Sequence, residues 1–131
     1  MKKRKIQIPI FNVPIILIRS SIDTVLAYLQ AIYHENFAAM RLDWELDGCC
    51  FTSLPDGKIV IWLAEENVKW PILSHETGHA TFEIMRMIGI QLTDEEVFCY
   101  LQQYINEQCQ CMLLEPMEPI DPPQILEDTL Q

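Results

Sequence analysis

Two of the chain's three histidines lie four residues apart, and a glutamate directly follows the first. The segment reads LSHETGHATF, from Leu73 to Phe82, and its chemical groups are His75, Glu76 and His79. Residues four apart lie on the same face of an α-helix, so the two imidazoles can converge on one ion. Nitrogen ligands of this kind suit zinc. The HExxH pattern therefore predicts zinc ligands at His75 and His79.

The glutamate of this motif indicates proton transfer. On a helix, Glu76 is rotated by about a third of a turn from His75, so its carboxylate reaches a zinc-bound water rather than the ion itself. Zinc lowers the pKa of such a water to about 7, and a neighbouring carboxylate can then act as the general base. The alternative is an ordinary helix on which these three polar residues face water.

Two histidines rarely hold a zinc ion alone, and several acidic residues are candidates for a third ligand. We favour Glu96, seventeen residues after His79, because an antiparallel second helix would bring its first turn back towards the motif. Alternatively, Thr93 and Glu96 form a capping box, in which the glutamate bonds to backbone. Glu95 and Glu83 are the other candidates, and Glu83 can also support the ligand one turn before it.

The spacing of apolar residues predicts the helix that the motif needs. It runs over Ile72–Ile88, with Pro71 in its first turn and Gly89 as its stop. A second helix follows from Thr93 to about Leu114. Upstream, the pattern predicts strands over residues 6–10 and 15–18. A helix is predicted from residue 22 to 34–36, with Ser20 or Ser21 as its cap. Strand character is predicted to return at Leu42, and a hairpin to pair residues 49–52 with 58–63. This order predicts an α+β fold, in which a small mixed or antiparallel sheet packs on the motif helix and two further helices.

Composition narrows the class of protein. The chain has 131 residues, of which 50% are hydrophobic, so we expect one domain over residues 1–114 and an acidic, proline-rich tail over 115–131. A net charge of −10 argues against nucleic acid as a partner. Five cysteines without a CxxC pair indicate reduced thiols, and no segment has the length of a membrane span, so we expect a cytoplasmic protein. Trp62 and Trp70 are expected in the core, and His34 at the surface.

HETGH and the later DEEVFCYLQQYI resemble a minimal zincin metallopeptidase of the gluzincin type. The chain is most similar to small HExxH proteins of phages and prophages, over roughly Lys5 to Leu114. In those, an acidic residue four before a Tyr-Leu pair is the third ligand, and here that residue is Glu96. The ImmA-like metallopeptidases are the second resemblance, although their acidic-x-x-Ala-Asn stretch is not present here.

The resemblance implies a zinc-dependent endopeptidase, which cleaves internal peptide bonds of a polypeptide substrate. The substrate would extend the sheet along an edge strand, expected here at Ile59–Leu63. Tyr100 and Tyr104 are candidates, by their chemistry alone, for stabilising charge in the transition state. The alternative function is a non-catalytic, metal-binding interaction module on the same fold, working between phage and host or in regulation.

Overall fold

The computed structural model describes residues 1–8, 11–34, 47–65 and 70–114. They form seven elements: β1 (Lys2–Gln7), β2 (Pro14–Ser20), α1 (Ile22–Tyr33), β3 (Gly48–Phe51), β4 (Ile59–Ala64), α2 (Trp70–Ile88) and α3 (Glu95–Leu114). The predicted α+β class and order of elements are confirmed. Some predictions fall outside the described residues. They concern Ile10, the strand from Leu42 to residue 46, most of the 65–69 connection and the 115–131 tail. None of the described helices is both long and apolar enough to cross a membrane.

The four strands form one mixed sheet in the order β1-β2-β4-β3. β1 and β2 are antiparallel, β2 and β4 are parallel, and β3 and β4 form the predicted antiparallel hairpin. The prediction that Ile59–Leu63 is an edge strand is therefore wrong, because β4 lies between β2 and β3. A crossover that contains α1 produces the parallel pairing, in which Ile15 lies opposite Ile59. Among the strands that the structure describes, the edge strands are β1 and β3.

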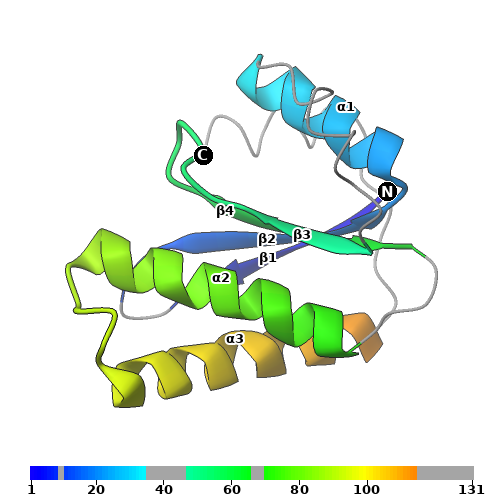
Figure 1. Ribbon diagram of the computed structural model, residues 1–131. Helices are drawn as coiled ribbons and strands as arrows, with labels where there is room; N and C mark the ends of the chain where they lie inside the picture. The colour runs from blue at the N-terminus through cyan, green and yellow to red at the C-terminus, as the bar shows by residue number, and fades with distance from the viewer. Residues whose placement is uncertain (9–10, 35–46, 66–69, 115–131) are drawn as a thin grey trace.

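Helices cover both faces of the sheet, with α1 on one side and α2 and α3 on the other (Figure 1). β2 and β4 are apolar at almost every position because both of their faces are buried. Trp62 lies in the core as predicted, 2% exposed, and its indole N–H donates to the Ser20 carbonyl at 3.1 Å. Trp70 does not lie in the core as predicted, since it is at the start of α2 and 45% exposed.

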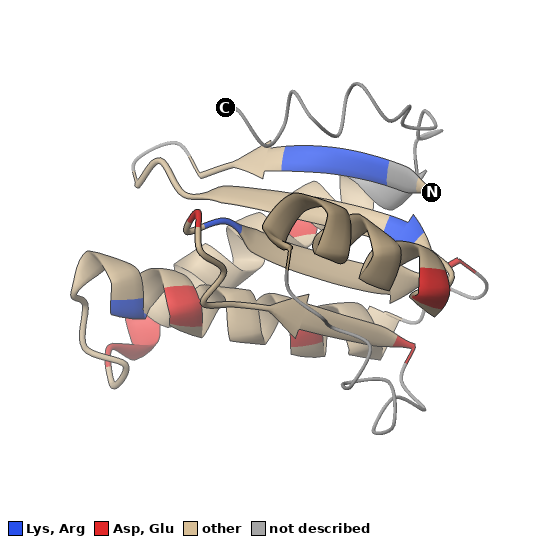
Figure 2. Cartoon of the chain, turned by 90° about the horizontal axis from the view of Figure 1, so that it is seen from above, with Lys and Arg blue, Asp and Glu red and all other residues tan. Residues whose placement is uncertain are grey.

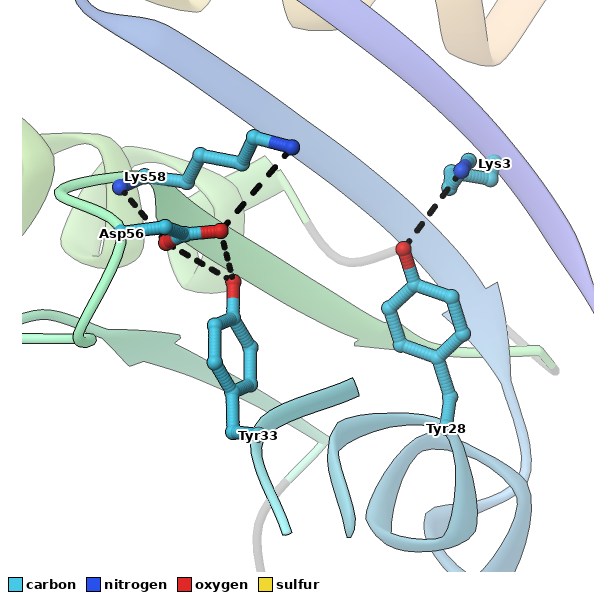
Figure 3. A network of polar contacts seen from close by, with 5 residues as sticks. All are labelled: Lys3, Tyr28, Tyr33, Asp56 and Lys58. Carbon is cyan, nitrogen blue, oxygen red and sulfur yellow. Dashed lines mark hydrogen bonds and ion pairs between the residues drawn. The ribbon is translucent and has the colours of Figure 1, made fainter. Parts of the chain in front are cut away.

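Polar contacts connect α1 to the strands of the sheet and their turn (Figure 3). The Tyr33 hydroxyl lies 3.0 Å from each carboxylate oxygen of Asp56 in the β3–β4 turn. The Lys58 ammonium lies 3.9 Å from the same carboxylate. Earlier on α1, the Tyr28 hydroxyl accepts a hydrogen bond from the Lys3 ammonium of β1 at 3.4 Å. These contacts join the helix to strands at both ends of the sheet.

The helix ends follow the residues at their caps. Ser21 caps α1, as one of the two predicted options, by accepting from the Thr24 N–H. Gly89 follows α2 with φ of +78°, the left-handed conformation that glycine adopts without strain. At α3 the Asp94 carboxylate accepts from the Val97 N–H at 3.2 Å. Asp94 is therefore the N-cap, and the alternative capping box beginning at Thr93 is not the arrangement found.

Candidate metal centre

The motif helix α2 runs beside the edge strand β3. A β-carbon added to Gly48 would lie 2.8 Å from Cγ2 of Ile72, so the start of β3 lies against the first turns of α2. At the other end, a β-carbon on Gly57 in the hairpin turn would lie 3.9 Å from Cε of Met87. The helix thus follows the hairpin from the strand ends to the turn, and its motif lies beside β3.

The two histidines of the motif point at one another from successive turns. Their Nε2 atoms are 3.1 Å apart, and the rings meet edge to face with centroids 4.7 Å apart. Two nitrogen ligands on one tetrahedral zinc lie about 3.3 Å apart, given Zn–N bonds of about 2.0–2.1 Å. Both side chains are exposed, which leaves the nitrogens accessible. The spacing of His75 and His79 therefore fits two ligands of a single zinc ion.

Glu76 lies inside the protein, although its two histidine neighbours in the motif are exposed. It is 7% exposed, and burial raises the pKa of its carboxyl above the usual range. The positive charge of the imidazoles and a hydrogen bond from the Cys50 backbone act in the opposite direction. The carboxyl group is thus held between α2 and β3 by a backbone donor, next to the histidine pair.

Two cavities adjoin the motif, and His75, Glu76 and Gly48 line both of them. Each has a volume of about 370 Å³. The first, which we call the distal cavity, extends towards the C-terminal half of α2 and is lined also by Phe82 and Leu92. The second, the proximal cavity, lies by the first turn of α2 and is lined also by Asp47, Pro71 and Ile72. His75 and Glu76 therefore border both cavities, whereas His79 borders only the distal one.

Other reactive side chains in the distal cavity are already engaged or neutral. Glu83 pairs with Arg86, whose Nε donates to it at 3.0 Å, and a second guanidinium nitrogen contacts the other carboxylate oxygen. Burial, and next the charge of Glu76, raise the pKa of the Cys49 thiol to about 11 and that of Cys50 further. Both cysteines are therefore neutral thiols, which are poor zinc ligands in this state.

The predicted third ligand, Glu96, does not reach the histidines. Gln102 of α3 lies at the level of the motif, since its amide donates to the Ser74 carbonyl at 3.2 Å. Glu96 precedes Gln102 by six residues, which is about 9 Å along a helix, and its side chain is exposed. Glu95 is exposed on the same turn. We expected the first turn of α3 to lie beside the middle of α2, but it lies beside the C-terminal end of α2.

Glu83 is the only one of the three predicted candidates that lines the same cavity as the histidines. It follows His75 by eight residues on the same helix, however, a rise of about 12 Å. Within the described residues, no three side chains of His, Cys, Asp or Glu are grouped closely enough to hold one ion. The described part of the site therefore consists of two candidate ligands and an adjoining carboxylate.

The two tyrosines proposed from their chemistry are not at the site. Tyr100 is 70% exposed, and Tyr104 packs against the core below the sheet. Neither lines a cavity beside the histidines. His34 ends α1 on the opposite face of the sheet, exposed as predicted, with its backbone N–H bonded to the Gln30 carbonyl.

Some contributors to the site were not found from sequence. Gly48 borders both cavities, and the Cys50 backbone bonds to Glu76. Asp47 lines the proximal cavity with His75 and Glu76. A backbone donor has no residue-type signal, and Asp47 stands next to no motif. Only the prediction that a hairpin precedes the motif helix pointed to this strand.

Searches of protein-family models, curated protein sequences and solved structures find no match to this chain. The resemblance to gluzincin-type metallopeptidases thus stays a prediction that rests on HETGH and the residues around it. What the geometry adds is the spacing of two imidazole nitrogens, the burial of the intervening glutamate and the two hollows beside them.

Proposed function

We propose that the chain is a zinc-dependent peptidase in which His75 and His79 hold the ion and Glu76 is the general base. The observation that carries the proposal is the 3.1 Å separation of the two Nε2 atoms, with the buried Glu76 one residue from the first. In such a site zinc supplies polarisation of a carbonyl and acidification of water, to a pKa of about 7.

Glu76 is suited to moving protons in both directions. Its carboxylate takes a proton from the attacking water, and the same group then gives that proton to the leaving amine. A general base works best when its pKa lies near the working pH, and burial raises the pKa of Glu76 in that direction. The hydrogen bond from the Cys50 backbone holds the carboxyl group in place while it is deprotonated.

The free edge for a polypeptide substrate is β3 rather than β4. The Ala64 N–H donates to the Asp47 carbonyl at 2.8 Å, and alternate residues of β3 continue this ladder with β4. Gly48 and Cys50 therefore turn their backbone groups away from β4, to the side of β3 on which the structure describes no further strand. Glu76 engages the Cys50 N–H, which leaves Gly48 as the position where an extended peptide joins the edge. Cavities on both sides of His75 favour a chain that continues in both directions, hence internal cleavage.

The test is hydrolysis of an unfolded protein, such as reduced and alkylated casein, by the zinc-loaded wild type and by Glu76→Gln. Loss of a general base lowers the rate by about 10²–10⁴-fold. Zinc content is measured in both proteins, since the ligands are unchanged. Glu107→Gln on α3 is the matched control, because it removes an exposed carboxylate elsewhere. Equal cleavage by wild type and Glu76→Gln contradicts the proposal.

A non-catalytic metal-binding module is the second candidate. Phe82 and Leu92 line the distal cavity although they are 44% and 50% exposed, and exposed apolar side chains in a hollow suit a stably bound partner as well as a substrate. In that case zinc binds to the wild type, no substrate is cleaved, and Glu76→Gln has no effect on partner binding. The same experiment therefore separates the two functions.

A further inference from the structure

The distal cavity follows the edge strand β3 and one face of α2. Its lining runs from Gly48 to Thr52 on the strand side. On the helix side its lining residues recur every three or four positions, as residues on one helix face do, and include His75, His79, Phe82 and Arg86. From His75 to Arg86 the helix rises by about 16 Å, which equals about five residues of extended chain. An extended peptide that reaches the histidines can therefore continue along this cavity.

Two large apolar side chains line the distal cavity beyond the histidines. Phe82 and Leu92 are both exposed to solvent, although each borders a hollow. Phe98 of α3 packs against Phe82, with ring centroids 4.7 Å apart and planes tilted by 43°. Phe98 is itself partly buried against the core, so the Phe82 ring is held in place. An apolar side chain of a bound peptide would remove these exposed surfaces from water, which is favourable.

Charges in this part of the distal cavity are compensated within the protein. The Glu83 carboxylate is paired with Arg86, and Cys49 and Cys50 are neutral thiols because burial raises their pKa. Figure 2 shows both charge signs at the end of α2 that leads into α3, whereas most of that helix is uncharged. Beyond the motif, the described lining residues thus offer no single charge to pair with a substrate. A charged side chain would lose its water here without compensation, so an apolar one fits better.

The place of Phe82 on α2 sets which substrate residue meets this apolar wall. Phe82 follows His79 by three residues and His75 by seven, so it lies about 7–8 Å along the helix from the midpoint of the pair. Each residue of an extended peptide spans about 3.3 Å. The substrate residue that meets Phe82 is therefore about two positions away from the bond that lies at the histidines.

We propose that the distal cavity selects a large apolar residue, aromatic or long aliphatic, about two positions from the cleaved bond, and that Phe82 and Leu92 determine this preference. The inference rests on the proposed function, because the histidine pair places the cleaved bond. Large apolar side chains are mostly buried in folded proteins. The substrates are therefore unfolded or extended segments that expose such a residue.

Short peptides of alanine and serine, with a single phenylalanine moved from position to position, test the proposal. We expect the zinc-loaded wild type to cleave at a constant distance of about two residues from the phenylalanine, as mapped by mass spectrometry. One methylene group in an apolar pocket changes kcat/KM by about 10–200-fold. Replacement of the phenylalanine by alanine or aspartate should therefore lower kcat/KM at least about 10-fold. Equal kcat/KM for the three peptides, or a preference for aspartate, overturns the proposal.

Substitutions in the wall of the distal cavity identify the residues responsible. Leu92→Lys places a positive charge there, so the ratio of kcat/KM for the phenylalanine peptide to that for the aspartate peptide should fall at least about 10-fold. Phe82→Ala should lower the preference for phenylalanine over alanine. Tyr100→Lys is the matched control for Leu92→Lys, because Tyr100 is exposed on α3 and lines neither cavity. Circular dichroism shows that each variant is folded. Ratios in Leu92→Lys that equal those of Tyr100→Lys contradict the proposal.

Peptide binding separates failure of this proposal from failure of the peptidase proposal. Fluorescence anisotropy measures the affinity of zinc-loaded Glu76→Gln for the same three peptides. Tighter binding of the phenylalanine peptide, together with no cleavage by the wild type, supports the apolar pocket and contradicts the peptidase. Cleavage of casein by the wild type, with no preference among the three peptides in cleavage or binding, contradicts the apolar pocket and leaves the peptidase supported.

Discussion

The Glu76 carboxylate accepts a hydrogen bond from the backbone of Cys50, which ties the motif helix to the edge strand of the sheet. The bond satisfies a backbone donor that points away from β4, and it orients a buried carboxyl group. Strand and helix therefore position the proposed base together, one residue from His75. A motif that is only five residues long in sequence depends on a strand that ends at Phe51, 24 residues before His75.

Glu96→Gln should leave zinc affinity unchanged. Its side chain is exposed on the first turn of α3, away from the cavities beside the histidines. Zinc titration against a competing chelator measures the effect. Removal of even a residue that supports a ligand commonly costs 10–100-fold in affinity, on the order of what such a titration resolves easily. A loss of that size in Glu96→Gln would show that α3 reaches the site and that the present assignment of its first turn is wrong.

Asp94→Ala should lower the free energy of unfolding by about 1 kcal/mol, the usual cost of losing an N-cap. The reason is that its carboxylate accepts from the Val97 N–H at the start of α3. Thr93→Ala is the matched control, since the neighbouring residue is not the cap, and it should have little effect. Urea denaturation measures both. The reverse order of effects would indicate the Thr93 capping box.

Gly48→Ala should destabilise the fold by about 1–3 kcal/mol, the range for overpacking. The added carbon would lie 2.8 Å from Cγ2 of Ile72 and 3.1 Å from the Trp62 carbonyl oxygen. Gly78→Ala is the contrasting change, because its new carbon meets only the Gln102 amide at 3.5 Å. Alanine is favoured over glycine within helices by about 1 kcal/mol, so this variant should be more stable than the wild type. Thermal unfolding of the two variants decides whether β3 lies as close to α2 as described.

Lys3 should titrate well below an ordinary lysine. Burial, then the charges of Lys58 and Lys5, lower its pKa to about 8. The folded state thus binds fewer protons than the unfolded state between about pH 8 and the ordinary lysine value near 10.4. The contribution of Lys3 to the free energy of unfolding therefore rises with pH across that window. Below the window, the folded state is destabilised by the full cost of burying the charged ammonium group.

Substitutions of the lysines test the direction of these effects on stability and on the pKa of Lys3. Lys3→Met should be more stable than the wild type at pH 7, and the difference should disappear above about pH 10.5, where the ordinary lysine is also neutral. Lys58→Met should raise the pKa of Lys3 more than Lys5→Met does, because Lys58 has the larger effect. NMR titration of the Lys3 side chain measures this directly. A pKa near the ordinary value would mean that Lys3 is more solvated than the packing against Tyr28 indicates.

Local patterns were enough to predict the elements of this fold. The Pro-Asp-Gly turn and the caps at Ser21 and Gly89 are short-range signals, and each appears where expected. The first strand, predicted over residues 6–10 from alternating apolar residues, instead runs over Lys2–Gln7. The parallel pairing of β2 with β4 is a long-range feature that no local pattern encodes. Because of this pairing, the edge strand is β3 rather than the predicted β4, and the expected place of a substrate changes accordingly.

The site divides in the same way. His75, Glu76 and His79 are set by one turn of helix, so their relationship follows from spacing alone. The residues that come from other elements were predicted less well: Glu96 depends on how far α3 slides along α2, and that is decided by packing, such as the contact between Phe82 and Phe98. Gly48 and the Cys50 backbone act through position rather than through side-chain chemistry, which left no sequence signal to use.

The central claim is that His75 and His79 are ligands of one zinc ion, and its most direct test is a zinc-binding isotherm of the metal-free protein. We predict one zinc per chain in the wild type, and a loss of more than about 100-fold in affinity when either histidine is replaced by alanine. That loss is larger than replacement of a residue that only supports a ligand usually causes. His34→Ala, which changes the histidine on the opposite face of the sheet, should bind as the wild type does. Zinc affinities that are the same in the wild type, His75→Ala and His79→Ala would contradict the account.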